Sequence, residues 1–147
     1  YFPSGGRLLT VAAGGEVFIW NTRSGAVLRK LTAGHEESAD IFEAQVLPDG
    51  DRVVTLASDR QAVLWSTEAG SVLRRFKLLI GHGEHRAIRP LAPGDRFVTG
   101  VTDEASEPAV IWDVESGRAL YQLLQDDDPV EFLEASPCGR RIAMAGW

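Results

Sequence analysis

The sequence predicts an all-β protein built from repeated four-stranded antiparallel units, and two observations support this prediction. The first is the stretch 50–76, in which three short apolar runs are separated by polar turns. Short runs rich in Val, Leu and Trp, bounded by Asp, Ser and Gly, are typical of consecutive strands. The second is that this stretch recurs along the chain.

The recurrence has a nearly fixed period. Trp20, Trp65 and Trp112 are separated by 45 and 47 residues, and a glycine follows each of them five residues later. A phrase of the form Arg-apolar-apolar-Thr also recurs, at Arg7, Arg52 and Arg96, with a looser copy at Arg141. A period of this length, with several strands in each unit, indicates a β-propeller of four-stranded blades.

The blades are expected at approximately 1–33, 34–80, 81–125 and 126–147, the first and last being incomplete. Propellers close with about four to eight blades. The sequence therefore predicts an incomplete ring, and we expect a longer parent chain or self-association to close it, because an open stack leaves an apolar face bare at each end.

Each expected strand is bounded by turn residues. The hairpin at Gly14-Gly15 permits positive φ, and Pro-x-Gly turns end the innermost strands. Charged residues such as Arg29 and Arg74 interrupt the fourth strands, so we place these at the outer rim, where charge discourages edge-to-edge pairing. The expected strands are 8–13, 17–20, 26–32, 41–47, 53–57, 62–65, 97–102, 109–112, 118–125, 130–135 and 141–146. A further rim strand begins with the apolar run 72–73 and carries the charged residues Arg74, Arg75 and Lys77.

Composition excludes several classes of protein. The 147 residues are 44% hydrophobic and 24% charged, as in an ordinary globular protein. The net charge of −6 argues against a nucleic-acid-binding surface. The sequence has no apolar run of the length that spans a membrane. A single cysteine, Cys138, excludes an internal disulfide, and we expect it in a turn of a cytoplasmic protein.

Several spaced motifs together resemble the WD-repeat family of propellers, over the whole chain. His82 follows a glycine and lies eleven residues before Pro93, which begins a turn. Asp59 stands six residues before Trp65, and the pair Trp112-Asp113 is followed by Ser-Gly. Elsewhere the Trp-Asp pair is degraded, to Trp-Asn and Trp-Ser.

This resemblance implies a buried hydrogen-bonded set in each blade. A carboxylate in a tight turn accepts hydrogen bonds from turn amides and an imidazole, the imidazole bonds a hydroxyl, and an indole N–H needs one acceptor. We expect incomplete sets in the first blade, where Gly14 takes the Asp position, and in the fourth, where Asp126 takes the His position. The residues implied are His35, Thr55, Asp59 and Trp65 in the second blade, and His82, Thr99, Asp103 and Trp112 in the third.

We interpret these sets as structural rather than catalytic. They repeat once per blade and lack the G-x-S-x-G nucleophile elbow of a hydrolase. His82 and His85 flank Glu84, but a solvated loop position for His85 is the simpler interpretation than a zinc ligand. The run 126–128 lacks the glycine of a calcium loop. We therefore expect no catalytic residue, no metal and no cofactor.

One face of the predicted propeller is acidic. The loops that enter the blades, and the turns between second and third strands, carry twelve of the 21 acidic residues. Arg60 and Arg86 are the fixed positive charges expected there. We hypothesise that this face docks a basic segment of a protein partner, although a role in solubility explains it equally well. The candidate residues are Glu36, Glu37, Asp40, Glu104, Glu107, Asp126, Asp127 and Asp128.

The function expected is that of a non-catalytic scaffold for protein–protein interaction, within a larger intracellular multidomain protein. The resemblance extends to propellers attached to signalling nucleotidases of the NACHT type. The alternative is part of an enzyme propeller, a quinone-dependent dehydrogenase or a hydrolase. That alternative needs a convergent polar site on the innermost strands, which offer Gln45, Glu43, Arg89, Glu131 and Glu134.

Overall fold

The computed structural model describes residues 1–12, 15–32, 34–78, 85–101, 108–123 and 132–145. Over these residues the protein is all-β, with thirteen strands and no helix, which confirms the predicted class. Accordingly, the described segments contain no helix long and apolar enough to cross a membrane.

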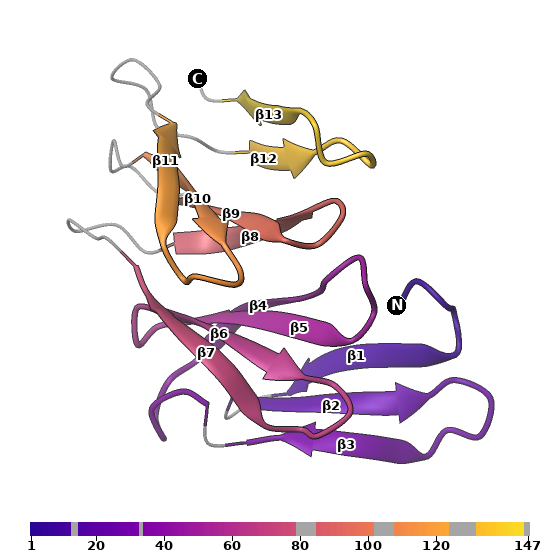
Figure 1. Ribbon diagram of the computed structural model, residues 1–147. Helices are drawn as coiled ribbons and strands as arrows, with labels where there is room; N and C mark the ends of the chain where they lie inside the picture. The colour runs from indigo at the N-terminus through magenta and orange to yellow at the C-terminus, as the bar shows by residue number, and fades with distance from the viewer. Residues whose placement is uncertain (13–14, 33, 79–84, 102–107, 124–131, 146–147) are drawn as a thin grey trace.

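The strands form four antiparallel sheets, and within each sheet neighbours in sequence are neighbours in space (Figure 1). The second and third sheets have the four strands expected of each unit. The first sheet contains β1 (Arg7–Ala12), β2 (Glu16–Asn21) and β3 (Val27–Leu31). The second contains β4 (Ile41–Val46), β5 (Arg52–Ala57), β6 (Gln61–Ser66) and β7 (Val72–Lys77). The third contains β8 (His85–Leu91), β9 (Arg96–Val101), β10 (Ala109–Asp113) and β11 (Ala119–Leu123), and the fourth β12 (Phe132–Ala135) and β13 (Ile142–Ala145).

The fourth strand of the second sheet, β7, reaches Lys77 and so includes the charged residues expected on a rim strand, while Phe76 supplies its inward apolar side. One expectation about these elements needs correction. His85, which we expected in a loop, is the first residue of β8 and pairs with Val101. The strand begins earlier than its apolar run because the pairing with β9 continues past it.

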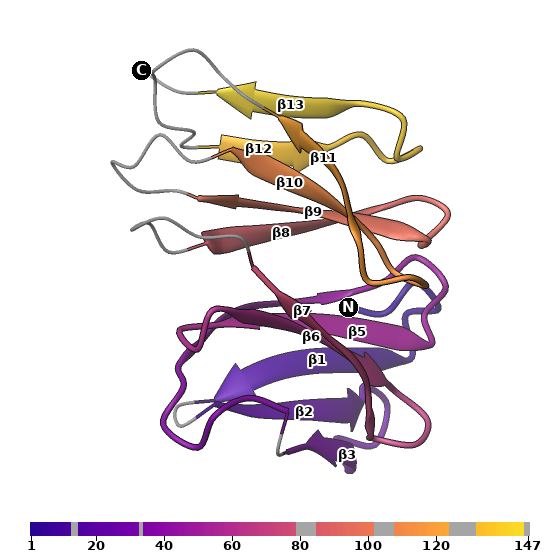
Figure 2. The same ribbon diagram turned by 60° about the vertical axis from the view of Figure 1, so that its left-hand side comes forward.

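The four sheets stack face to face in chain order, and Figures 1 and 2 show an open stack with the first sheet at the bottom and the fourth at the top. Each contact between neighbouring sheets is a separate apolar cluster. The second sheet is buried on both faces, because Val53 and Trp65 pack toward the first sheet while Val54 and Leu64 pack toward the third. This two-sided burial explains why β5 and β6 are almost continuously apolar.

Two copies of the repeated arginine, at the starts of β1 and β5, join neighbouring sheets. Arg7 Nη2 donates to the carbonyl oxygen of Gly50 at 2.7 Å, and Arg52 Nη2 donates to that of Gly94 at 2.9 Å. In both cases the acceptor is the glycine of the turn that precedes the second strand of the next sheet. The repeated Arg therefore has a structural role between sheets.

The charged rim strands make a second contact of this kind. Arg29 Nε donates to the Glu68 carbonyl oxygen at 2.9 Å, and Arg74 Nη1 donates to that of Ser116 at 3.4 Å. The interpretation of these arginines only as guards against edge pairing was therefore incomplete. Each also binds the outer turn of the following sheet.

Ionised side chains on the innermost strands link three sheets. Arg89 of β8 contacts Glu43 of β4 at 2.7 Å through Nη1, and Glu134 of β12 at 3.1 Å through Nε. Glu43 also accepts hydrogen bonds from the Ile88 backbone N–H and the Gln45 side chain, each at 2.7 Å. The polar residues on these strands are thus used to bond one sheet to the next.

Candidate functional site

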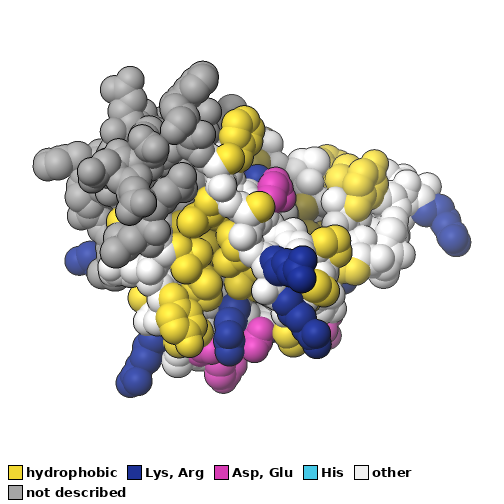
Figure 3. Space-filling view, turned by 90° about the horizontal axis from the view of Figure 1, so that it is seen from above, with side chains coloured by type: hydrophobic (Ala, Val, Ile, Leu, Met, Phe, Trp, Pro, Cys, Tyr) yellow, Lys and Arg dark blue, Asp and Glu magenta, His cyan; other side chains and the backbone are white. Residues whose placement is uncertain are grey.

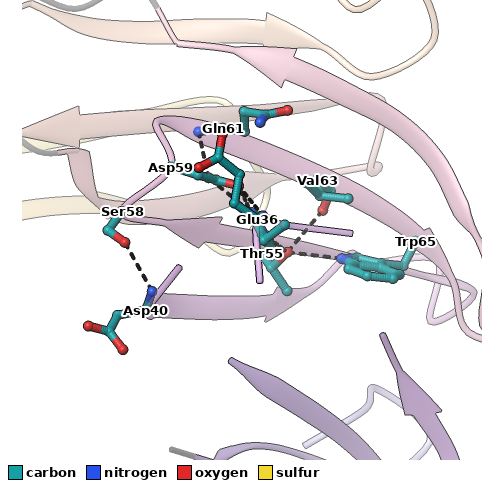
Figure 4. Close-up of polar contacts among 9 residues, drawn as sticks. Glu36, Asp40, Thr55, Ser58, Asp59, Gln61, Val63 and Trp65 are labelled. Carbon is teal, nitrogen blue, oxygen red and sulfur yellow. Dashed lines mark hydrogen bonds and ion pairs between the residues drawn. The ribbon is translucent and has the colours of Figure 1, made fainter. Parts of the chain in front are cut away.

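The structure brings His35, Thr55, Asp59 and Trp65 into one hydrogen-bonded chain. His35 Nδ1 lies 2.9 Å from Asp59 Oδ2, and His35 Nε2 lies 2.7 Å from Thr55 Oγ1. Trp65 Nε1 donates to the same Thr55 oxygen at 2.9 Å (Figure 4). Thr55 belongs to β5 and Trp65 to β6, while His35 and Asp59 come from the loop before β4 and the turn between β5 and β6. We name these four residues the His35 set.

The turn geometry around Asp59 orients its carboxylate. Oδ1 accepts the Gln61 backbone N–H at 3.1 Å, and Oδ2 accepts the Glu36 backbone N–H at the same distance (Figure 4). The Asp59 side chain is 0% exposed and that of His35 is 5% exposed. The carboxylate therefore bonds the loop before β4 to the turn after β5.

The proton positions in the His35 set follow from its environment. Burial lowers the pKa of His35 below the ordinary 6.5, and this effect outweighs the Asp59 carboxylate, which raises the pKa. A neutral imidazole donates from Nδ1 to Asp59 and accepts at Nε2 from the Thr55 hydroxyl. The three hydrogen bonds then run in one direction: the Trp65 indole donates to Thr55, Thr55 donates to His35, and His35 donates to the Asp59 carboxylate. A protonated His35 would instead turn the Thr55 hydroxyl hydrogen toward the Val63 carbonyl oxygen, 3.4 Å away.

The packing around residue 34 explains why the residue before His35 is a glycine. A Cβ atom added to Gly34 would overlap the Cη2 and Cζ2 atoms of the Trp65 ring. The backbone of residue 34 thus lies directly against the six-membered ring of the Trp65 indole, and Trp65 is 1% exposed. No larger residue fits there without moving either the ring or the loop that carries His35.

Part of the set recurs in the other sheets. Trp112 Nε1 donates to Thr99 Oγ1 at 3.0 Å in the third sheet, and Trp20 Nε1 donates to Thr10 Oγ1 at 2.8 Å in the first. His82 and Asp103, the other predicted members in the third blade, lie outside the described residues. We had not assigned the pair Thr10–Trp20, although the repeated Arg-apolar-apolar-Thr phrase was a sufficient signal for it.

The residue after each Trp caps a turn. Asn21 Oδ1 accepts the Ser24 backbone N–H at 3.0 Å, and Ser66 Oγ accepts the Ala69 backbone N–H at 3.1 Å. Asp113 Oδ1 accepts the Ser116 backbone N–H at 2.6 Å and its hydroxyl, and these hydrogen bonds lower the pKa of Asp113. Asn, Ser and Asp are therefore interchangeable here, since each provides one acceptor oxygen.

The candidate acidic face is less acidic than the sequence indicated. Glu36 and Glu37 line a hollow of about 540 Å³ between the first two sheets. Glu16, however, forms an ion pair with Lys30. Lys77 lines a second hollow, of about 470 Å³, together with Glu36, Asp59 and Arg60. The rim strands β3 and β7 also end on this candidate acidic face and bring Lys30 and Lys77 to it. Positive charge on the face is therefore not confined to Arg60 and Arg86.

Of the other acidic residues proposed to bind a partner, only Asp40 lies among the described residues. The Asp40 backbone N–H is bonded to Ser58 Oγ at 3.0 Å, which anchors the loop before β4 (Figure 4). Glu104, Glu107 and the run 126–128 lie outside the described residues. Three candidates, Glu36, Glu37 and Asp40, thus come from one loop.

The His35 set is a buried hydrogen-bond network among the described residues. They contain no group of three or more His, Cys, Asp or Glu side chains that could hold a metal ion. Thr55 is fully buried and bonded to both His35 and Trp65, so its hydroxyl has no space for a substrate. Cys138 is exposed, and a hydrogen bond with Ser136 lowers the pKa of its thiol.

Comparison of the chain with protein-family models and with curated proteins gives no match. Assignment of a family therefore depends on the residues and contacts described above.

Proposed function

We propose that the chain is part of a WD-repeat β-propeller and acts as a non-catalytic scaffold for protein–protein interaction. The observation that carries this proposal is the Trp–Thr hydrogen bond, which recurs at the same register in the first three sheets, at 2.8, 2.9 and 3.0 Å. In the second sheet it extends through His35 to Asp59, in the combination that characterises the WD-repeat resemblance. Further sheets, from a longer parent chain or a second copy, are required to close the ring.

The polar residues of the innermost strands support a scaffold rather than an enzyme. Catalysis at a central channel requires polar groups that are free to meet a substrate. Glu43 and Arg89 instead bond each other, and Arg89 also bonds Glu134. These contacts hold successive sheets together and account for the charged residues without a catalytic role.

The docking surface that we propose is the loop carrying Glu36 and Glu37, and its partner is a basic segment of another protein. The Asp59 carboxylate binds the Glu36 backbone at 3.1 Å, so the loop is held in a defined position beside the hollow. Both glutamates line that hollow, and the ammonium group of Lys30 is already bonded to Glu16. Two carboxylates at the mouth of a hollow attract a Lys or Arg side chain, and charge of this kind raises association rates.

The test uses a fluorescein-labelled hexa-arginine peptide and measures its anisotropy with the 147-residue chain. We expect the double variant Glu36→Gln/Glu37→Gln to weaken binding about fivefold or more at low salt, with the difference shrinking as added salt screens the charges. The matched control is Glu68→Gln/Glu115→Gln, which removes the same charge from exposed turns at the other end of the strands. Equal weakening by both double variants would assign the attraction to net charge and contradict a docking loop.

A further inference from the structure

The rim strands of the first three sheets each contain one extra residue, and in all three it is a leucine. β3, β7 and β11 are the outermost strands of their sheets. Opposite the repeated Trp, the register of each rim strand shifts by one residue, so that a β-bulge leaves one residue without a cross-strand partner. The residues at these bulges are Leu28, Leu73 and Leu120.

The three bulge leucines are exposed, whereas every other leucine that the structure describes is buried or half-buried. Leu28 is 41% exposed, Leu73 is 51% exposed and Leu120 is 39% exposed. Val27 of β3 and Tyr121 of β11 are exposed next to two of them. A bulge changes the direction of a side chain, and here it turns a leucine toward solvent at the same place in three sheets. The outer rim therefore carries a repeated apolar feature that the core does not use.

The rims of neighbouring sheets join into one surface. Leu28 lines a hollow of about 190 Å³ with Thr67 and Glu68, which belong to the outer turn of the second sheet. The same turn lies beside β3 in Figures 1 and 2, and a Cβ atom on its Gly70 would be 3.5 Å from Arg29 Cδ. The second and third sheets meet in the same way, through the rim arginine of β7. We name this surface the rim surface, and its exposed apolar residues are Val27, Leu28, Leu73, Leu120 and Tyr121.

The rim surface is basic, although the chain has a net charge of −6. β3 contains two basic residues and β7 contains three, and the three rim strands contain no acidic residue. One of the five, Lys30, is paired with Glu16. Figure 3 shows Lys and Arg side chains next to hydrophobic ones along the lower margin of the molecule, with a few Asp and Glu side chains among them. The turns before the rim strands, at 22–26, 67–71 and 114–118, add no net charge, because they carry Arg23, Arg118, Glu68 and Glu115.

This combination specifies the chemistry of a partner. A segment that covers exposed leucines and meets unopposed positive charge needs apolar and acidic side chains together. A bulge and charged side chains on an edge strand discourage pairing with a further strand. A helix needs no hydrogen bond from a strand edge, and it can carry apolar residues on one side with acidic residues flanking them. The rim surface therefore favours a helix over an added strand.

We propose that the rim surface binds an acidic amphipathic helix of a partner protein. The apolar side of the helix covers Leu28 and Leu73, and its acidic side chains meet the basic residues of β3 and β7. The rim is the outer wall of the stack, so sheets added to close a ring leave it uncovered. This docking is separate from the acidic loop at Glu36 and does not depend on it.

The test uses a fluorescein-labelled helical peptide with Leu at every third or fourth position and Glu at the others, and it measures the anisotropy of this peptide with the 147-residue chain. We expect saturable binding that Leu28→Ser/Leu73→Ser weakens about tenfold, because two leucines lose their apolar contact with the peptide. The matched control is Val11→Ser/Phe132→Ser, which removes two exposed apolar side chains outside the rim and should leave binding unchanged. Equal weakening by both double variants would indicate a general attraction to exposed apolar groups and would overturn the proposal.

A second arm of the test changes the peptide and leaves the protein unaltered, so it does not depend on the folding of a variant. The peptide with Gln in place of Glu should bind about fivefold more weakly, although the net charge of the chain alone would favour the neutral peptide. The Leu–Glu peptide with Pro at its centre, which interrupts the helix, should also bind more weakly. Absence of saturable binding, or equal affinity of the three peptides, would contradict an acidic helix at the rim.

Two further measurements identify the class of partner. Binding should not be weakened by Glu36→Gln/Glu37→Gln, and it should persist in a longer polypeptide with further repeats. Loss of binding in the longer polypeptide would assign the rim surface to the parent chain and overturn a partner protein. Vesicles of phosphatidylglycerol provide the other comparison. Vesicle binding that Leu28→Ser/Leu73→Ser removes, with no saturable binding of the peptide, would assign the rim surface to a lipid membrane and likewise overturn the proposal.

Discussion

Gly34 lies so close to the six-membered ring of the Trp65 indole that a side chain at residue 34 would overlap the ring. The next residue, His35, bonds Thr55, and Thr55 accepts the indole N–H of Trp65. The loop that carries Gly34 and His35 is therefore joined to the sheet twice, once by packing and once by hydrogen bonds.

The substitution Gly34→Ala tests the packing contact. We expect it to destabilise the protein by about 3 kcal/mol, at the upper end of overpacking effects, because the new methyl group overlaps a buried ring with nowhere to move. Chemical denaturation followed by Trp fluorescence measures this loss. Gly6→Ala is the control, since a Cβ atom there meets no atom within 4 Å. Equal stability of the two variants would show that the Gly34 loop moves freely.

The hydroxyl at the centre of the His35 set is tested by Thr55→Val, which keeps the shape of the side chain. The change leaves the Trp65 N–H and His35 Nε2 without partners in a buried place, and we expect it to cost about 2–4 kcal/mol. Thr10→Val is the matched change in the first sheet. There both Thr10 and Trp20 are partly exposed, so water replaces the lost partner and the cost should stay below about 1 kcal/mol. Urea denaturation of the two variants measures both costs, and the reverse order would contradict a buried network.

The lowered pKa of His35 predicts how stability depends on pH. Because the folded protein binds this proton less readily than the unfolded chain, His35 contributes its full stability above the ordinary pKa of 6.5. That contribution falls as the pH decreases below 6.5 toward the lowered pKa of the folded state. The free energy of unfolding, measured between about pH 7.5 and 5.5, should therefore decrease more steeply for the unmodified chain than for His35→Gln. His82 and His85 are present in both proteins, so parallel curves would mean that His35 is not responsible.

Arg52 bonds its own sheet to the next one, so replacing this arginine should lower the stability of the protein. Arg52→Ala loses the hydrogen bonds to the Gly94 carbonyl and, at 2.6 Å, to the Asp49 carboxylate, and should cost about 1 kcal/mol. Arg52→Lys should recover less than half of this, because an ammonium group does not reproduce the geometry of the guanidinium. Thermal unfolding measures both changes, with Arg23→Ala in an exposed turn as the control. Full recovery by lysine would indicate that charge alone matters at this position.

The His35 set could be predicted because the resemblance to WD-repeat propellers implied it, with its members at the positions that match that family's repeat. His35 and Asp59 lie in loops at the same end of β5 and β6, and the antiparallel register brings Thr55 and Trp65 together. The full set in the third blade could not be followed, since His82 and Asp103 lie outside the described residues. The pair Thr10–Trp20 lies in the first sheet, where Gly14 at the Asp position predicted an incomplete set.

The sequence by itself determined the all-β class, the sheets of four strands and most strand positions, because apolar alternation and turn residues are local properties of the chain. Only the tertiary structure decided the contacts between sheets. Arg7 and Gly50 are 43 residues apart, and Arg89 and Glu43 are 46 apart. Such pairs meet because of how one twisted sheet stacks on the next. Lys30 and Glu16, by contrast, meet within one sheet, because β2 and β3 are paired strands.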